Sequence, residues 1–196
     1  MRVSFVKSSK SKGYLNLGIT EDNGKYVYTV SEAVYAEIGS PCRGAQIDRG
    51  MLESICDADE RYRAKSIALR LLSYADNNER SLQIKLVSRG ISREVAREVI
   101  DQMVSVGYIN EKRQLERLIL KEANVSLAGP KKIITKLMAK GYAHSDIEEV
   151  LSSLCASGEI DFEKNKRELI AKNATRGAVD EQINKFLYKN GYSVGE

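Results

Sequence analysis

A period of two in the apolar residues occurs in only one part of the chain, near its N-terminus. Residues 15–19 alternate in this way, as do residues 26–30, and an Asn23-Gly24 pair that favours a type I′ turn lies between them. This pattern predicts a β-hairpin, to which residues 2–6 could add a third strand. A lone hairpin is marginal in water, so its apolar faces either pack on a helix near residues 48–56 or form a docking surface for a partner; we expect packing.

From residue 48 onward the apolar residues recur every three or four positions, which is the period of an amphipathic helix. The pattern predicts helices near residues 48–56, 58–75, 79–89, 92–106, 111–124, 129–140, 144–157, 161–174 and 178–190, after a short helix at 31–39. Asn78 and Ser92 are the expected N-caps of two of them, and Ser145 and Glu148 have the spacing of a capping box.

One segment of the pattern occurs three times. Gly90, Gly141 and Gly191 each follow an amphipathic stretch and precede an apolar residue, and they are 51 and 50 residues apart. Each glycine is expected to end a helix in the left-handed conformation, with the next residue packed back on the last turn. A repeat of this length is typical of stacked helical units.

The predicted fold class is therefore mainly α. Tandem three-helix repeats form an elongated curved body, with a small N-terminal β-hairpin region. The expected domains are the hairpin with short helices at 1–56, a first repeat at 57–109, a second at 110–160 and a truncated third at 161–196.

The 196 residues carry a net charge of +4, but the charge is segregated along the chain. Residues 80–97 hold five basic side chains and one acid, residues 121–140 hold the same numbers, and residues 145–163 hold six acids and no Lys or Arg. Basic side chains at regular spacing suit a polyanion backbone, although a charged face can also be merely solvated. The candidate nucleic-acid or filament-binding residues are Lys85, Arg89, Arg93, Arg97, Lys121, Lys131, Lys132, Lys136 and Lys140.

Residues suited to catalysis are scarce. His144 is the only histidine, no phosphate-binding Gly-rich motif occurs, and the cysteines lack metal or redox spacing. We expect no catalytic residues, no metal and no cofactor. The three cysteines are expected to be reduced and mostly buried, and the N-terminus has no apolar run of signal-peptide length. These features predict a cytoplasmic protein that does not enter a membrane.

Several motifs together resemble the RecX family of regulatory proteins. They are residues 64–72, Leu82-x3-Leu86-x2-Arg89-Gly90-Ile91, Gly107-Tyr108-Ile109 and Gly129-Pro130-x2-Ile133-x3-Leu137-x2-Lys140-Gly141. The resemblance covers roughly residues 40–192. It implies tandem three-helix repeats and a non-enzymatic protein that binds the RecA recombinase and its filament on single-stranded DNA. It also implies modulation, mostly inhibition, of the ATPase, strand-exchange and coprotease activities of RecA.

The chain departs from the family pattern at a few positions. Asn110 and Glu111 stand where the family usually has two aspartates, Gln114 and Leu115 where it often has an aromatic-Ala pair, and Asn78 and Ser81 where it has Ser and Glu. A monomeric regulator of RecA is the preferred hypothesis. The alternative is an independent helix-turn-helix-like DNA-binding protein that reads bases with Gln83 and Arg93.

Overall fold

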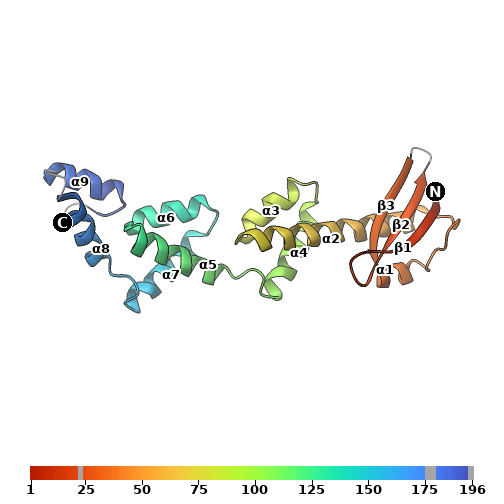
Figure 1. Ribbon diagram of the computed structural model, residues 1–196, viewed down its shortest axis with the longest axis horizontal. Helices are drawn as coiled ribbons and strands as arrows, with labels where there is room; N and C mark the ends of the chain where they lie inside the picture. The colour runs from red at the N-terminus through yellow and green to blue at the C-terminus, as the bar shows by residue number, and fades with distance from the viewer. Residues whose placement is uncertain (22–23, 175–179, 194–196) are drawn as a thin grey trace. The chain divides into compact units, whose positions relative to one another are not determined.

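The computed structural model describes residues 1–21, 24–174 and 180–193. It is mainly helical with a small antiparallel sheet at the N-terminus, which confirms the predicted fold class (Figure 1). The strands are β1 (Arg2–Ser8), β2 (Tyr14–Glu21) and β3 (Gly24–Ser31). The helices are α1 (Glu32–Glu37), α2 (Arg49–Tyr74), α3 (Glu79–Val87), α4 (Arg93–Ser105), α5 (Glu111–Leu120), the π-helical turn η1 (Lys121–Val125), α6 (Pro130–Ala139), α7 (His144–Ala156), α8 (Phe162–Ala174) and α9 (Asp180–Lys189).

The N-terminal sheet has three strands in the order β1-β2-β3, so the third strand is present. Strand β2 pairs with β3 antiparallel, with Leu17 opposite Tyr28 and Ile19 opposite Tyr26. The two apolar rows therefore face each other across the hairpin. The predicted turn with Asn23 and Gly24 at its centre was wrong for Gly24, because Gly24 is the first residue of β3 and pairs with Glu21. Residues 22–23 lie outside the described residues.

The sheet buries its apolar side against α2, so the expected intramolecular packing is confirmed. Its core consists of Val3, Leu17, Ile19, Val30, Ile38, Ile47 and Ile55. Of these, Ile55 belongs to α2, which runs for 26 residues without a break. The predicted boundary between helices at 48–56 and 58–75 was wrong, because no Gly or Pro interrupts the sequence between the two ranges.

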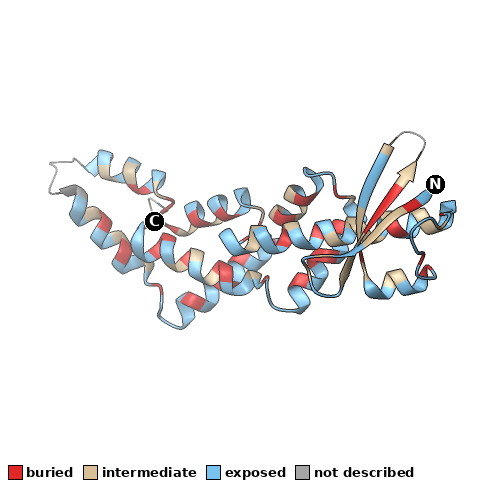
Figure 2. Cartoon of the chain, turned by 45° about the vertical axis from the view of Figure 1, so that its right-hand side comes forward, coloured by how far each residue is buried: buried red, intermediate tan, exposed pale blue. Residues whose placement is uncertain are grey.

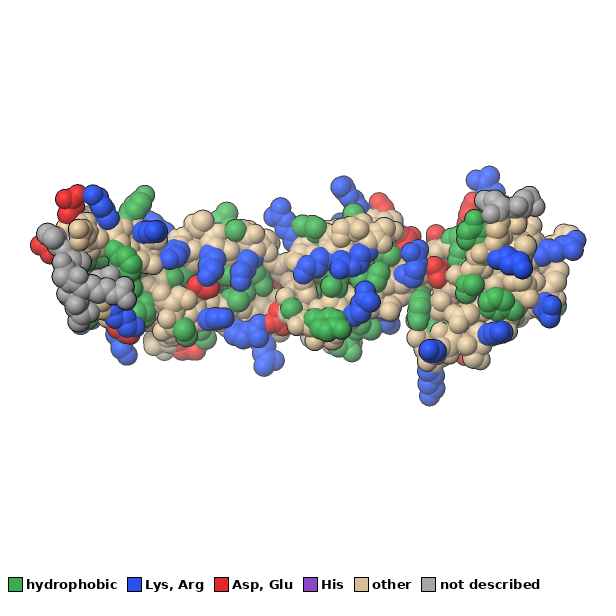
Figure 3. Space-filling model, turned by 45° about the horizontal axis from the view of Figure 1, so that its top comes forward, with side chains coloured by type: hydrophobic (Ala, Val, Ile, Leu, Met, Phe, Trp, Pro, Cys, Tyr) green, Lys and Arg blue, Asp and Glu red, His purple; other side chains and the backbone are tan. Residues whose placement is uncertain are grey.

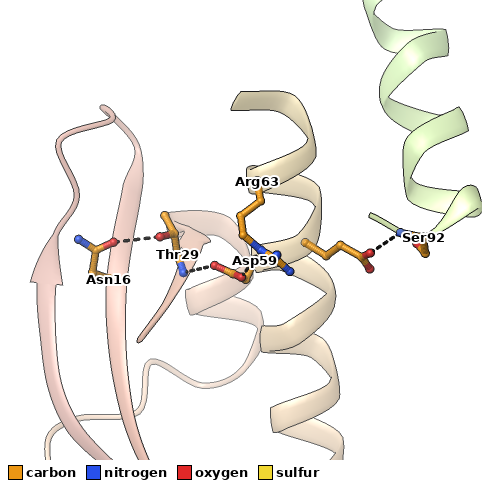
Figure 4. A network of polar contacts seen from close by, with 6 residues as sticks. Asn16, Thr29, Asp59, Arg63 and Ser92 are labelled. Atoms are coloured by element: carbon orange, nitrogen blue, oxygen red, sulfur yellow. Dashed lines mark hydrogen bonds and ion pairs between the residues drawn. The ribbon is translucent and has the colours of Figure 1, made fainter. Parts of the chain in front are cut away.

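Polar contacts fix α2 to its neighbours on both sides (Figure 4). Asp59 accepts a hydrogen bond from the backbone N–H of Thr29 on β3, at 2.8 Å, and pairs with Arg63, also at 2.8 Å. One residue along the helix, Glu60 accepts a 2.6 Å hydrogen bond from the backbone N–H of Ser92, just before α4. Helix α2 thus holds the sheet and α4 in one compact body.

The three glycines end their helices as the repeat predicts. Gly90, Gly141 and Gly191 have φ angles of 80°, 96° and 85°, in the left-handed region that a side chain disfavours. The residue after each glycine donates its N–H to the carbonyl four positions before the glycine, with distances of 3.1–3.3 Å. This contact closes the helix end and turns the following apolar side chain towards the core.

The predicted N-caps have mixed outcomes. Asn78 accepts from the N–H of Ser81 at 2.8 Å and Ser92 accepts from the N–H of Val95 at 3.4 Å, so both caps are confirmed. The capping box at Ser145 was wrong. Helix α7 begins at His144 with Ala143 as its N-cap, so Ser145 already lies inside the helix. The Ser145 hydroxyl hydrogen-bonds to the Asp146 carboxylate instead.

The chain forms two compact units. Met1–Ala75 and Leu82–Ser105 make up the first, and Asp76–Ser81 and Val106–Glu196 make up the second. Buried residues recur along the longer helices of both units, whereas α1 has none (Figure 2). In the second unit, one core gathers side chains from α5, α6 and α7, including Leu115, Ile133 and Ile147. A smaller core follows it, with Leu127, Leu169, Leu187 and Tyr192.

Candidate polyanion-binding surfaces

Helix α6 is positioned by a backbone contact at its start. The N–H of Gly129 donates to the carbonyl of Asn190 at 2.7 Å, and the N–H of Lys131 donates to the carbonyl of Gly191 at 3.3 Å. A Cβ atom on Gly129 would lie 2.5 Å from the carbonyl carbon of Gly191. The Gly-Pro element therefore does more than open a helix: its glycine lets two backbones touch.

A related contact occurs about fifty residues earlier in the sequence, within the second unit. The Asn78 side-chain amide donates to the carbonyl of Lys140 at 2.9 Å, so the loop before α3 meets the residues that end α6. Lys140 and Asn190 occupy equivalent places in the repeat. The loop before each glycine-stopped helix thus receives the end of the next such helix.

Buried tyrosines support both contacts. Tyr142 donates to the Gln114 carboxamide oxygen at 3.0 Å, and Gln114 in turn donates to the carbonyl of Asn77 at 3.4 Å. Tyr192, fifty residues later, donates to the carbonyl of Leu127 at 3.1 Å. Burial raises the pKa of Tyr142 and of Tyr192, which keeps both hydroxyls protonated as donors. Gln114 was noted in the sequence only as a departure from a family pattern.

The basic residues predicted in the second unit lie on α6, next to it, or at the start of η1. Lys121, Lys131, Lys132, Lys136 and Lys140 are all exposed. Lys132 donates to the Asn190 side chain at 2.9 Å. Lys136 is different, because it pairs at 2.5 Å with Glu122, a carboxylate in η1 that is only 7% exposed. Much of its charge is neutralised inside the protein.

The basic residues predicted in the first unit lie on α3, on α4 and in the turn between them. Arg89, Arg93 and Arg97 are exposed, whereas Lys85 is half-buried and its carbonyl accepts from the Arg89 guanidinium at 2.7 Å. Helix α3 differs from the expectation of a purely basic outer face, because Ile84 is 62% exposed and Val87 36%. On the face of the molecule drawn in Figure 3, Lys and Arg side chains outnumber acidic ones.

Sequence reasoning missed the basic residues of α2. Arg61 and Lys65 line a small pocket of about 200 Å³ with Tyr14, Tyr62 and Gln102. Arg61 hydrogen-bonds to Glu98 at 3.0 Å, which raises the pKa of its guanidinium. These basic residues were not predicted as a site because acidic residues, Asp57, Asp59 and Glu60, lie close to them in the sequence, and only uniformly basic stretches were considered.

The described part of the chain contains no group of three or more His, Cys, Asp or Glu side chains placed to hold a metal ion. None of the helices in that part is long and apolar enough to cross a membrane. His144 is exposed and lies 3.2 Å from Glu148 one turn further along α7. The expectation of mostly buried cysteines was wrong, because Cys42 and Cys155 are exposed and only Cys56 is partly covered.

Comparison with known proteins gives consistent results. The family model described as RecX, first three-helix domain, matches residues 64–103. Regulatory protein RecX of Limosilactobacillus reuteri is 23% identical over 195 residues, which are 98% of this chain and 72% of the relative. Regulatory protein RecX of Clostridioides difficile is 27% identical over 153 residues, with 76% of this chain and 72% of the relative covered.

Solved structures share the fold. A crystal structure of regulatory protein RecX superposes with a TM-score of 0.73 at 22% identity, covering 98% of this chain and 94% of that one. The crystal structure of RecX from Lactobacillus salivarius gives a TM-score of 0.62 at 25% identity, over 69% of this chain and 90% of that one. By sequence motifs, family model and fold together, the chain matches the RecX family of regulatory proteins.

Proposed function

We propose that this protein is a non-enzymatic, cytoplasmic regulator that acts as a monomer on the RecA recombinase. It binds RecA and its filament on single-stranded DNA, and it mostly inhibits ATP hydrolysis, strand exchange and coprotease activity. The regulator role is that of the family. The observation that carries the DNA part of the proposal is the exposed lysine cluster of the second unit.

The lysines at the start of α6 suit a phosphate backbone. Lys131 and Lys132 are both exposed in the first turn of the helix. Each lysine that meets a phosphate releases a counterion, so binding should weaken as salt increases.

The deciding experiment measures RecA ATPase on single-stranded DNA while this protein is titrated well below the RecA concentration. Inhibition by the wild type is expected. The double change Lys131→Glu and Lys132→Glu should weaken inhibition and reduce the salt dependence of filament binding. The same charge change at Lys10 and Lys12, exposed residues of the β1–β2 loop, is the matched control. Full ATPase activity at every concentration of the wild type would refute the proposal.

The alternative, an independent DNA-binding protein, is favoured by one observation. Gln83 and Arg93, the residues suited to reading bases, line the same groove between α3 and α4. Sequence-selective binding to duplex DNA without RecA, lost in Arg93→Ala, would support this alternative. Binding that is equal for all duplex sequences would count against it.

A further inference from the structure

The two basic surfaces differ in chemistry. The groove on the first unit measures about 450 Å³ and is lined by Gln83, Ile84, Val87, Ser88 and Arg93. Its floor is apolar, since Ile84 and Val87 are both well exposed on α3. The residue that corresponds to Ile84 on α6 is Thr135, whose hydroxyl bonds to the carbonyl of Lys131 at 2.8 Å. Of these two surfaces, the α3–α4 groove pairs exposed branched aliphatic side chains with an arginine, whereas the exposed apolar side chain of α6 is Met138, which is unbranched.

Exposed aliphatic side chains gain little from a sugar-phosphate backbone. They gain free energy by losing contact with water, which requires another apolar surface. Exposed apolar groups rimmed by polar ones are typical of surfaces that bind a protein or another apolar partner. The floor of this groove therefore favours a protein over DNA.

The rim of the groove defines the charge of the partner. Arg93 is part of the lining, and Lys85 and Arg89 lie on α3 and in the turn that follows it. The one carboxylate next to Arg93 in sequence is Glu94, which is exposed on α4. The net charge around the groove is positive, so an acidic segment is attracted and a basic one is repelled.

We propose that the α3–α4 groove binds an acidic protein segment that inserts one or two apolar side chains between Ile84 and Val87. This inference rests on the proposed function, because the partner is the recombinase, and it deepens that function by separating the surfaces: the groove takes the protein and the α6 lysines take DNA. Ile84 is the anchor contact, and Arg93 pairs with a carboxylate of the segment.

The test uses Ile84→Asp in the full-length protein. The change places a carboxylate among the groove's apolar contacts and leaves the core alone, because Ile84 points outward. The matched control is Val125→Asp, which makes the same change at a residue of η1 that is 75% exposed and outside the groove. A melting curve for each variant checks that both remain folded.

Three quantities are measured for each variant: association with purified RecA without DNA, binding to a labelled single-stranded oligonucleotide, and inhibition of the RecA ATPase. Ile84→Asp should weaken association with RecA on the order of tenfold or more, as changes at interface anchors do. Its affinity for the oligonucleotide should stay within about twofold of the wild type, because the change does not alter a phosphate contact. Val125→Asp should match the wild type in all three.

The possible results separate the two proposals. If the wild type neither binds RecA nor inhibits its ATPase, the proposed function fails, and the groove assignment fails with it. If the wild type inhibits and Ile84→Asp inhibits equally, only the groove assignment is overturned. An equal loss of DNA and RecA binding would assign the groove to DNA. A concentration-dependent dimer that Ile84→Asp abolishes would assign it to a second copy of this chain.

Discussion

Gly129 and Gly191 touch through their backbones, and the contact leaves no room for a side chain at either residue. A Cβ on Gly191 would lie 2.4 Å from the N–H nitrogen of Lys132, and one on Gly129 would meet the carbonyl of Gly191. Backbone atoms cannot move aside as the end of a flexible side chain can. Close packing at this point thus depends on two glycines 62 residues apart in the sequence.

Gly129→Ala is expected to lower the free energy of unfolding by about 1–3 kcal/mol, which is the usual cost of forcing extra atoms into a packed contact. Chemical denaturation measures the change. Gly50→Ala is the control, since Gly50 lies in the first turn of α2 with only the Asp48 side chain near its Cβ position. It should be neutral or slightly stabilising, because alanine favours helix. Equal stability of Gly129→Ala and wild type would contradict the contact.

Gly141→Val is expected to destabilise the second unit by roughly 1–2 kcal/mol, because φ at this residue is +96° and a β-branched side chain is strained there. Gly141→Asn should cost less, since asparagine tolerates the left-handed region better than other residues. Thermal melting of the two variants checks the order. Identical melting temperatures would mean that the left-handed conformation is not what the position requires.

Gly141 and Gly129 differ in how much of their structural role can be predicted from the sequence. Gly141 follows an amphipathic stretch and precedes an apolar residue, so its left-handed role is visible in the local sequence. Gly129 also stands at a helix boundary, but its need for a close approach depends on a partner far along the chain. No local pattern specifies that partner.

Helix α6 illustrates the same limit for an element. Its ends, its buried face and its exposed lysines all follow from the sequence. Lys131, Lys132 and Lys136 look equivalent there, yet Lys136 reaches Glu122 in the preceding π-helical turn. The pair depends on how η1 packs against α6, and the sequence period of an ordinary helix does not predict a π-helical turn.

Lys136→Glu is therefore expected to destabilise the protein, and Lys131→Glu is not. The reversal at 136 leaves Glu122 buried against a like charge. We expect a loss of about 1–3 kcal/mol, less than for a fully buried pair because the Lys136 side chain is 47% exposed. Lys131→Glu should keep its melting temperature and weaken binding to single-stranded DNA.

Denaturation and salt-dependent binding of the two variants separate these roles. A double variant, Glu122→Gln with Lys136→Met, should recover most of the lost stability, because neither charge remains buried. If Lys136→Glu and the wild type have the same melting temperature, the ion pair between Lys136 and Glu122 contributes nothing to stability.

At the scale of the whole molecule, the core of the N-terminal sheet is built from one continuous stretch of the sequence. All seven buried side chains of its core lie within residues 3–55. Removal of residues 1–56 therefore takes this core away as a unit. What remains of α2 would then be without two hydrogen bonds to the sheet region, that of Asp59 with Thr29 and that of Tyr62 with Ser11.

A chain that begins at Asp57 is thus expected to stay folded and helical, and to retain part of its inhibition of RecA. Circular dichroism and the ATPase titration check both points. An insoluble product would show that the repeats need the sheet to fold. A folded product that binds DNA but no longer inhibits would make the sheet a surface for RecA.

The fold class, the repeat and the presence of the hairpin were predicted from the sequence, because each follows from local periodicity and glycine positions, whereas the strand register was not. The division into two compact units was not. It depends on Asn77 and Asn78, which are buried among residues of the later unit although they precede most of the first three-helix stretch. From the sequence alone, these two residues would be placed in the same unit as the residues next to them. Their hydrogen bonds to Gln114 and Lys140 place them in the second unit instead.

The placement of Asp76–Ser81 in the second unit makes the first unit discontinuous, with one part before this segment and one part after it. A break in the backbone after Ala75 would separate α2 from α4, although Arg61 pairs with Glu98 and Glu60 accepts from Ser92 between them. Of two polypeptides that end and start at this break, each would hold only a part of the first unit, whereas the second unit would be complete in the later one. We therefore expect the two fragments, when co-expressed, to associate through the contacts between α2 and α4 that complete the first unit.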